Sequence, residues 1–83
     1  MDTRVALIGI IVEDIDSAGQ VNEILHEFNK YVIGRMGIPY SPKNINIISV
    51  VVDAPGDVIS TISGKLGQLK GINSKVLYTK TSK

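Results

Sequence analysis

The chain has 83 residues, no cysteine, and a net charge of +1 from nine basic and eight acidic residues. This length fits one domain over residues 1–83, and the cysteine count excludes disulfides and thiolate metal sites. The balanced charge gives no footprint for direct nucleic-acid binding, and the longest apolar run is too short to cross a membrane. We therefore expect a cytoplasmic domain that contacts neither nucleic acid nor membrane.

A strand is predicted over residues 4–13, followed by a helix whose start Asp16 or Ser17 would cap. The strand is apolar at odd and even positions alike, which is typical of a central strand covered on both faces. The helix carries one apolar stripe at the i, i+3, i+4, i+7 spacing, formed by Val21, Ile24, Leu25 and Phe28.

The second predicted strand, residues 31–38, is interrupted by Gly34 and Gly37 on either side of Arg35 and Met36. Glycine within a strand marks a bulge or a close approach by a ligand or another backbone. We therefore interpret these four residues as a contact with a ligand or a second subunit. Arg35 would hold a carboxylate through two parallel hydrogen bonds. The alternative is an edge charge that discourages aggregation.

The rest of the chain repeats this plan, with a doubly apolar strand over residues 45–52 and an alternating edge strand over residues 74–79. Between them lies a helix that would begin near Pro55 and end at Gly71 in a left-handed conformation. A strip of small residues runs beside its apolar stripe. The strip either packs tightly on the domain's own sheet or contacts a ligand or another helix, and it comprises Ser60, Ser63, Gly64 and Gly67.

The order βαββαβ predicts an α+β, ferredoxin-like fold, with a four-stranded antiparallel sheet and two helices on one face. The first and third strands would be central and the other two would be edges. If the even positions pack under the helices, apolar side chains remain on the other face. Uncovered patches of this size are rare on monomers, so we predict a dimer or tetramer formed through that face. The predicted oligomer face comprises Val5, Leu7, Ile11, Ile47 and Val51.

Residues suited to catalysis or metal binding are few. His26 is the one histidine and lacks the partners that a metal site needs, so we expect no metal and no cofactor. Acidic residues gather after the first and third strands, at ends that we expect to lie near each other, but capping of helix starts accounts for each of them. No nucleophile–base pair or phosphate loop is present, so we expect no enzymatic activity.

Four segments together resemble the small regulators of the iron-only (FeFe) hydrogenase system. They are residues 34–40 (GRMGIPY), 45–49 (INIIS), 53–55 (DAP) and 63–67 (SGKLG), and the similarity covers residues 4–78. The resemblance implies an ACT-like regulatory protein, similar in fold to the C-terminal domain of nickel-responsive repressors. Because the chain begins directly at its first strand and lacks the histidines and cysteine of those repressors, it implies neither direct DNA binding nor their nickel site.

The turn Asp16-Ser-Ala-Gly19 is similar to the Asp-x-x-Gly turn of ligand-binding ACT domains, which makes Asp16 and Gly19 further candidate ligand contacts. The expected function is a homo-oligomeric regulatory module without catalysis. It would act through a small-molecule ligand or through a protein of the hydrogenase system. The alternative is an assembly factor for metalloenzyme maturation that binds no small molecule.

Overall fold

The computed structural model describes residues 2–79, and its elements follow the predicted order βαββαβ. The strands are β1 (Arg4–Val12), β2 (Val32–Tyr40), β3 (Ile45–Ala54) and β4 (Ile72–Tyr78). The α-helices are α1 (Ala18–Glu27) and α2 (Gly56–Gly67). Short 3-10 turns cover Ile15–Ser17, Asn29–Tyr31 and Ser41–Lys43.

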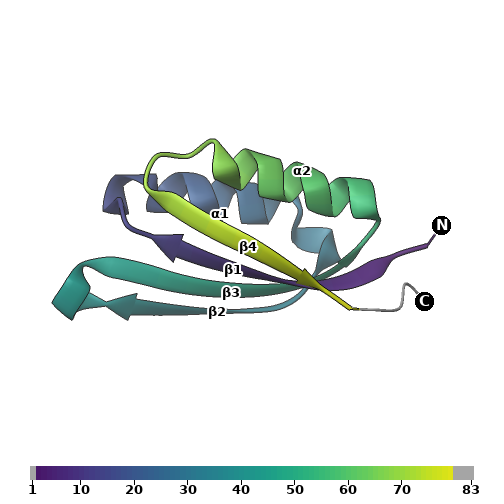
Figure 1. Cartoon of the computed structure of the whole chain (residues 1–83), viewed down its shortest axis with the longest axis horizontal. Coiled ribbons are helices and arrows are strands. Elements are labelled where there is room, and N and C mark those ends of the chain that lie inside the picture. Colours follow the sequence, from purple (N-terminus) through teal and green to yellow (C-terminus); the bar gives the residue numbers. More distant parts are fainter. Residues whose placement is uncertain (1, 80–83) are drawn as a thin grey trace.

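The four strands form one antiparallel sheet in the order β2-β3-β1-β4, and both helices cover the same face of it (Figure 1). The predicted ferredoxin-like α+β architecture is confirmed, with β1 and β3 in the centre and β2 and β4 at the edges. The central strands are apolar at both parities, although the helices cover only one face of the sheet (Figure 1).

The hydrophobic core lies between the sheet and the helices. Successive side chains of a strand point to opposite faces, so the even positions of β1 and β3 turn toward the helices. The apolar stripes of α1 and α2 pack onto them. The largest fully buried side chains are Ile8, Ile10, Val12, Val21, Val50, Val52, Ile59, Ile62 and Leu66. At the rim, the Lys65 ammonium of α2 lies 3.3 Å from the Glu27 carboxylate of α1.

The start of α1 is attached to the turn between α2 and β4. The buried Ser17 hydroxyl donates a 2.7 Å hydrogen bond to the Lys70 carbonyl, so it does not cap its own helix as predicted. The other predicted cap, Asp16, is also wrong. Asp14 instead caps the 3-10 turn Ile15–Ser17 that precedes α1, because its Oδ1 accepts a 3.0 Å bond from the Asp16 backbone N–H.

Gly71 has the predicted left-handed conformation, with φ of 71°, but α2 ends earlier, at Gly67. The turn of Gly71 belongs to the connection into β4. Its carbonyl accepts a 2.7 Å hydrogen bond from the backbone N–H of Glu13, at the end of β1. The left-handed glycine therefore orients β4 against β1 rather than ending the helix.

Strand β2 contains the irregularity that its glycines predicted, since its register against β3 shifts between Val32 and Gly34. Such a shift is a bulge, in which an additional residue of one strand is accommodated. After the bulge, the strand runs regularly to Tyr40, two residues beyond the predicted end at residue 38. The chain then turns through Asn44, whose φ of 53° is left-handed.

The expected meeting of acidic residues at one end of the sheet is wrong. Val12 of β1 pairs with Asn46 of β3, whereas Val5 pairs with Asp53. Because the two strands are antiparallel, the C-terminal ends of β1 and β3 lie at opposite ends of the sheet. Among residues 2–79, no group of three histidine or acidic side chains is placed to bind a metal ion. None of the helices in this range has the length and apolarity needed to span a bilayer.

Candidate functional site

The four residues predicted as one contact on β2 are divided between the two faces of the sheet. Gly34 pairs with Val51 and Met36 with Ser49, which places both on the face away from the helices. Arg35 pairs with the buried Val50, so its side chain turns toward the helices. Gly37 lies on the same side as Arg35. The sequence prediction of a single contact is therefore replaced by two separate surfaces.

The first surface is the face of the sheet opposite the helices, called the open face below. The predicted oligomer-face residues all lie on it, as the pairs Leu7–Val51 and Ile11–Ile47 show. Apolar side chains of the edge strands extend the surface beyond those five residues. The exposed large apolar side chains of the open face are Leu7 (40% exposed), Met36 (58%), Ile38 (44%), Tyr40 (43%) and Leu77 (67%).

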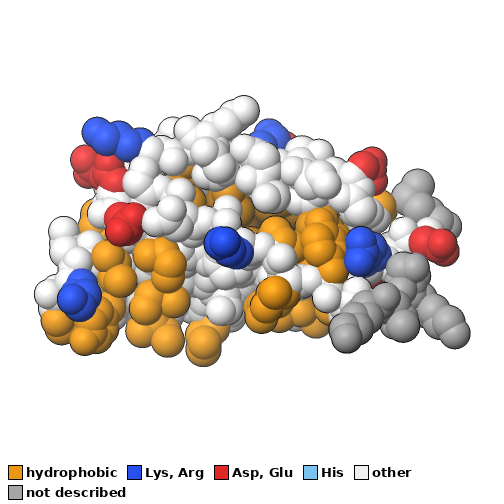
Figure 2. Space-filling model, viewed as in Figure 1, with side chains coloured by type: hydrophobic (Ala, Val, Ile, Leu, Met, Phe, Trp, Pro, Cys, Tyr) orange, Lys and Arg blue, Asp and Glu red, His pale blue; other side chains and the backbone are white. Residues whose placement is uncertain are grey.

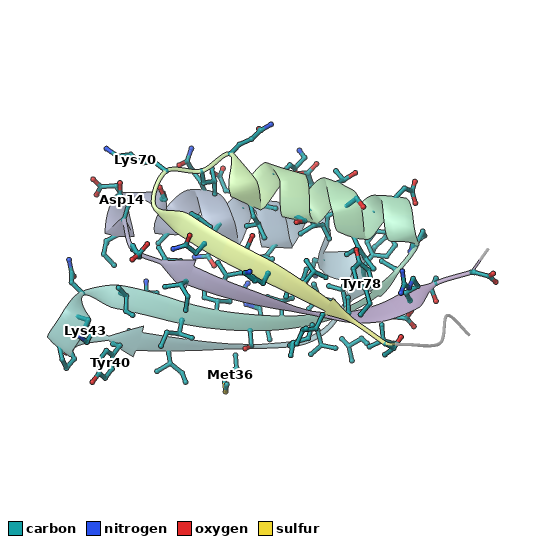
Figure 3. All side chains as sticks on the ribbon, viewed as in Figure 1. Asp14, Met36, Tyr40, Lys43, Lys70 and Tyr78 are labelled. Carbon is teal, nitrogen blue, oxygen red and sulfur yellow. The ribbon has the colours of Figure 1, made fainter. Side chains whose placement is uncertain are left out.

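The pictures show this surface from the side. Hydrophobic side chains line the lower edge of the molecule in Figure 2, below the sheet. In Figure 3, Met36 and Tyr40 point down from β2, away from both helices. The contribution of the edge strands to this surface was not predicted. The alternation of Met36, Ile38 and Tyr40 in the sequence could have shown it.

The centre of the open face is recessed relative to its surroundings, because the side chains there are small. Gly9 of β1 pairs with Ser49 of β3 on one side and with Lys75 of β4 on the other. A Cβ added at Gly9 would meet no atom within 4 Å. This central row separates two rows of apolar side chains and brings one cation, that of Lys75, to the edge of the surface.

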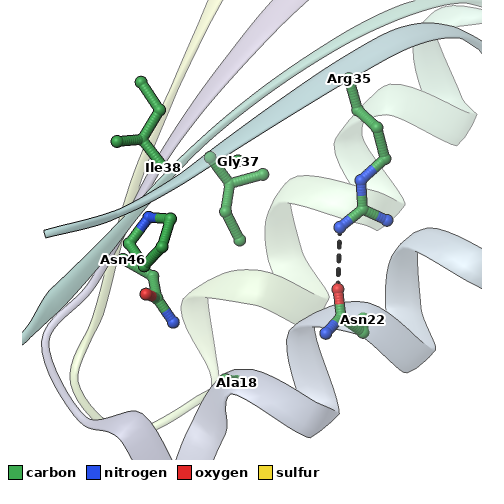
Figure 4. Close-up of a pocket in the computed structure, with 8 residues that line it drawn as sticks. Ala18, Asn22, Arg35, Gly37, Ile38 and Asn46 are labelled. Carbon is green, nitrogen blue, oxygen red and sulfur yellow. Dashed lines mark hydrogen bonds between the residues drawn. The ribbon is translucent and has the colours of Figure 1, made fainter.

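The second surface is a pocket between α1 and β2, called the Arg35 pocket below. Its volume is about 310 Å³. Arg35 reaches across it from β2, and Arg35 Nη2 donates a 2.8 Å hydrogen bond to Asn22 Oδ1 of α1 (Figure 4). The lining residues are Ala18, Asn22, Arg35, Gly37, Ile38, Pro39, Asn46 and Ile48.

In the part of the chain that the structure describes, the Arg35 pocket is lined by one charged side chain, the Arg35 guanidinium, and by two side-chain amides, from Asn22 and Asn46. The remaining lining residues are apolar or glycine. Ile38 borders the pocket, but its side chain points to the other side of the strand (Figure 4). Ala18 opens α1, and the N-terminal end of a helix carries partial positive charge. The pocket therefore combines a positive rim with an apolar wall.

The other predicted contacts, Asp16 and Gly19, belong to neither surface. Both are exposed, Asp16 in the turn before α1 and Gly19 on the helix itself. The partners that α1 and β3 contribute to the Arg35 pocket were not predicted from the sequence. The spacing of Ala18 and Asn22, one turn apart, and the isolated amide of Asn46 in an apolar strand were the available signals.

The strip of small residues on α2 does not pack tightly on the sheet. Gly64 and Gly67 are exposed, and a Cβ at either position would meet no atom within 4 Å outside the helix's own backbone. The tight-packing interpretation is therefore wrong. Part of the strip instead borders an open groove between α2 and β4, lined by Ser60, Ser63, Gly64, Ser74, Lys75, Val76 and Tyr78.

These features define a small ferredoxin-like α+β domain with one uncovered sheet face and a side pocket. The chain belongs to the TM1266-like family, described as "Iron-only hydrogenase system regulator, putative", whose model matches residues 4–76. It is similar to the solved structure of the uncharacterized protein TM1266 from Thermotoga maritima, with 35% sequence identity and a TM-score of 0.90. That similarity covers 94% of this chain and 99% of the other.

A second solved structure shares the fold alone. It is a formyltetrahydrofolate deformylase from Pseudomonas putida KT2440, with 13% sequence identity and a TM-score of 0.64. The similarity covers 88% of this chain and 28% of the deformylase. Among curated proteins, none matches the chain.

Proposed function

We propose that the protein is a regulatory module of the iron-only hydrogenase system, without catalytic activity, whose subunits associate through the open face. The description of its family supports the regulatory role. The observation that carries the association is the set of exposed apolar side chains on that face, from Leu7 at 40% exposure to Leu77 at 67%. A dimer or a tetramer would cover them.

The energy available from this face is large for so small a domain. Burial of apolar surface stabilises by about 25 cal/mol per Å². Covering several hundred Å² would therefore contribute roughly 10 kcal/mol before the costs of association, which is comparable to the stability of a whole domain. A small molecule would regulate such an assembly by binding the free and associated subunits with different affinities.

The test uses a charge placed in the centre of the open face. Gly9→Glu removes no contact, since a Cβ at Gly9 meets no atom within 4 Å, and the new carboxylate would stand beside Lys75 of β4. The folded subunit should therefore tolerate the change. In an oligomer the same carboxylate would be buried against a second apolar face, which costs several kcal/mol.

Sedimentation velocity at micromolar concentration should show a dimer or tetramer for the wild type and a monomer for Gly9→Glu, with unchanged circular dichroism. The matched control is Gly19→Glu, on the exposed surface of α1, where a Cβ also meets no atom within 4 Å. This control should remain oligomeric. A wild type that sediments as a single monomeric species would contradict the proposal.

A second function, that of an interaction factor for metalloenzyme maturation, is favoured by the composition of the open face. Met36 and Tyr40 are exposed on edge strand β2, and both residue types are enriched where proteins bind other proteins. Affinity purification should then recover hydrogenase maturation proteins with the wild type and lose them with Gly9→Glu. A thermal-shift screen that detects no stabilising small molecule, together with such a recovery, would select this function over ligand sensing.

A further inference from the structure

The Arg35 guanidinium carries a positive charge that no carboxylate balances within residues 2–79. Its hydrogen-bond partner there is the neutral amide of Asn22, at 2.8 Å, and the ion pair in this part of the chain joins Lys65 to Glu27 instead. A guanidinium has five N–H donors in a planar fork, so one bond to Asn22 leaves donors for a second partner. An anion that enters the Arg35 pocket would meet this fork directly.

The chemistry of the pocket selects among anions. A single guanidinium matches a single negative charge, and its planar fork fits the two oxygens of a carboxylate. Ala18, Pro39 and Ile48 offer apolar contact beside it. A volume of about 310 Å³ is at the lower end of the range for small-molecule sites, which suits a ligand of a few carbon atoms.

The lining also discriminates against amino acids. No acidic side chain of residues 2–79 lines the Arg35 pocket, so the ammonium of a zwitterion would find amide oxygens there but no opposite charge. Desolvation of an ammonium without an opposite charge is unfavourable. The pocket therefore favours a carboxylate that lacks an amino group over the corresponding amino acid.

We propose that the Arg35 pocket is a binding site for a small organic monocarboxylate with an apolar chain. Arg35 binds the carboxylate, the Asn22 and Asn46 amides border it, and Ile48 and Pro39 contact the chain. This proposal rests on the proposed function, since it names the class of ligand that the regulatory module would sense.

Gly37 keeps the pocket open. It lies on the helix side of β2, opposite Ile48, and a Cβ added there would meet no atom within 4 Å. Gly37→Val would therefore fill the pocket without disturbing the fold. Gly34 is its matched control, because it lies on the other face of the same strand and a Cβ added there also meets no atom within 4 Å.

The experiment is a two-dimensional amide NMR titration of the full chain with 4-methylpentanoate. Three probes are titrated in parallel: the neutral 4-methylpentanamide, leucine (the same skeleton with an amino group), and inorganic phosphate. The carboxylate should produce saturable shifts at Asn22, Arg35 and Gly37, with a Kd of about 1 mM. The amide, leucine and phosphate should each bind at least about tenfold more weakly. The amide has no charge, leucine has no net charge, and phosphate lacks the planar shape of a carboxylate.

Two variants localise the site. Arg35→Gln should weaken 4-methylpentanoate at least about tenfold, and Gly37→Val should abolish its binding. Gly34→Val should bind as the wild type does. Absence of saturable shifts at roughly 20 mM ligand, unchanged affinity in Arg35→Gln, or equal affinity for leucine, the amide or phosphate would overturn the proposal.

Sedimentation of the same samples separates the two proposals. The pocket is contained in one chain, so a wild type that is monomeric but binds 4-methylpentanoate would contradict the association and leave the binding site in place. An oligomer that fails to bind the carboxylate would overturn the binding site alone.

Discussion

Gly71 lies directly against Asp14: a Cβ on Gly71 would be 2.5 Å from the Asp14 Cβ and 2.9 Å from the Asp14 backbone nitrogen. This contact joins the turn before β4 to the residues that follow β1. The left-handed φ of 71° at Gly71 makes the same position unfavourable for any other residue.

Gly71→Ala should therefore reduce the free energy of unfolding by about 2–4 kcal/mol, from backbone strain and steric overlap. Urea denaturation measures the change. Gly64→Ala is the control, since Gly64 is an exposed residue within α2 with free space for a methyl group. It should increase stability by about 0.5–1 kcal/mol. Equal effects of the two substitutions would contradict this account.

Ser17→Ala removes the 2.7 Å hydrogen bond to the Lys70 carbonyl, which is made by a hydroxyl in a residue that is 4% exposed. Loss of a partly buried bond of this kind should cost about 1–2 kcal/mol. Ser60→Ala, on the exposed surface of α2, should change stability by less than about 0.5 kcal/mol. Thermal or urea unfolding of both variants tests whether the attachment of α1 to the turn after α2 stabilises the domain.

Neighbouring isoleucines of β1 should respond differently to truncation. Ile10 is fully buried under the helices, so Ile10→Ala should cost about 2–5 kcal/mol at any protein concentration. Ile11 lies on the open face and is partly exposed, so Ile11→Ala should cost less than about 2 kcal/mol in a dilute monomer. If subunits associate through the open face, the Ile11→Ala loss should grow with protein concentration. Concentration-independent losses for both variants would contradict that association.

The Lys65–Glu27 ion pair should contribute little. Its side chains are 44% and 54% exposed, and exposed pairs contribute about 0–1 kcal/mol. Lys65→Met preserves the apolar stem and should lower the free energy of unfolding by less than about 1 kcal/mol. The difference should vanish near 1 M salt, where charges are screened within about 3 Å. A larger loss that persists in salt would contradict this account, because a screened ion pair could not produce it.

The sequence predicted the fold well because its two inner strands are apolar at both parities, as residues 5–12 show. That pattern indicates a central position in a sheet. The helices were predicted equally well, since Val21 and Leu25 lie on the predicted apolar stripe of α1 and both are buried. The ends of elements were less accurate, because Gly71 serves a turn rather than the helix that precedes it.

The candidate sites were predicted only in part. Arg35 was recognised, but its partner Asn22 lies on another element, and the pairing depends on how α1 crosses the sheet. The acidic residues were misplaced because strand direction was neglected: Asp53 pairs with Val5, at the beginning of β1. Alternation along β2 was also insufficient, since a register shift interrupts it after Val32.

The register shift in β2 determines which side chains of this strand lie on each face of the sheet. Val32 pairs with Val52, yet Gly34, two positions later, pairs with Val51, so Ile33 takes up one step of the strand. If Ile33 instead paired with Val51 in a regular ladder, every later residue of β2 would slip by one position and turn to the other side of the sheet. Arg35 would then point into the apolar face, and Met36 would turn toward α1. The bulge at Ile33 thus directs the charge of Arg35 toward the helices and the side chain of Met36 to the open face.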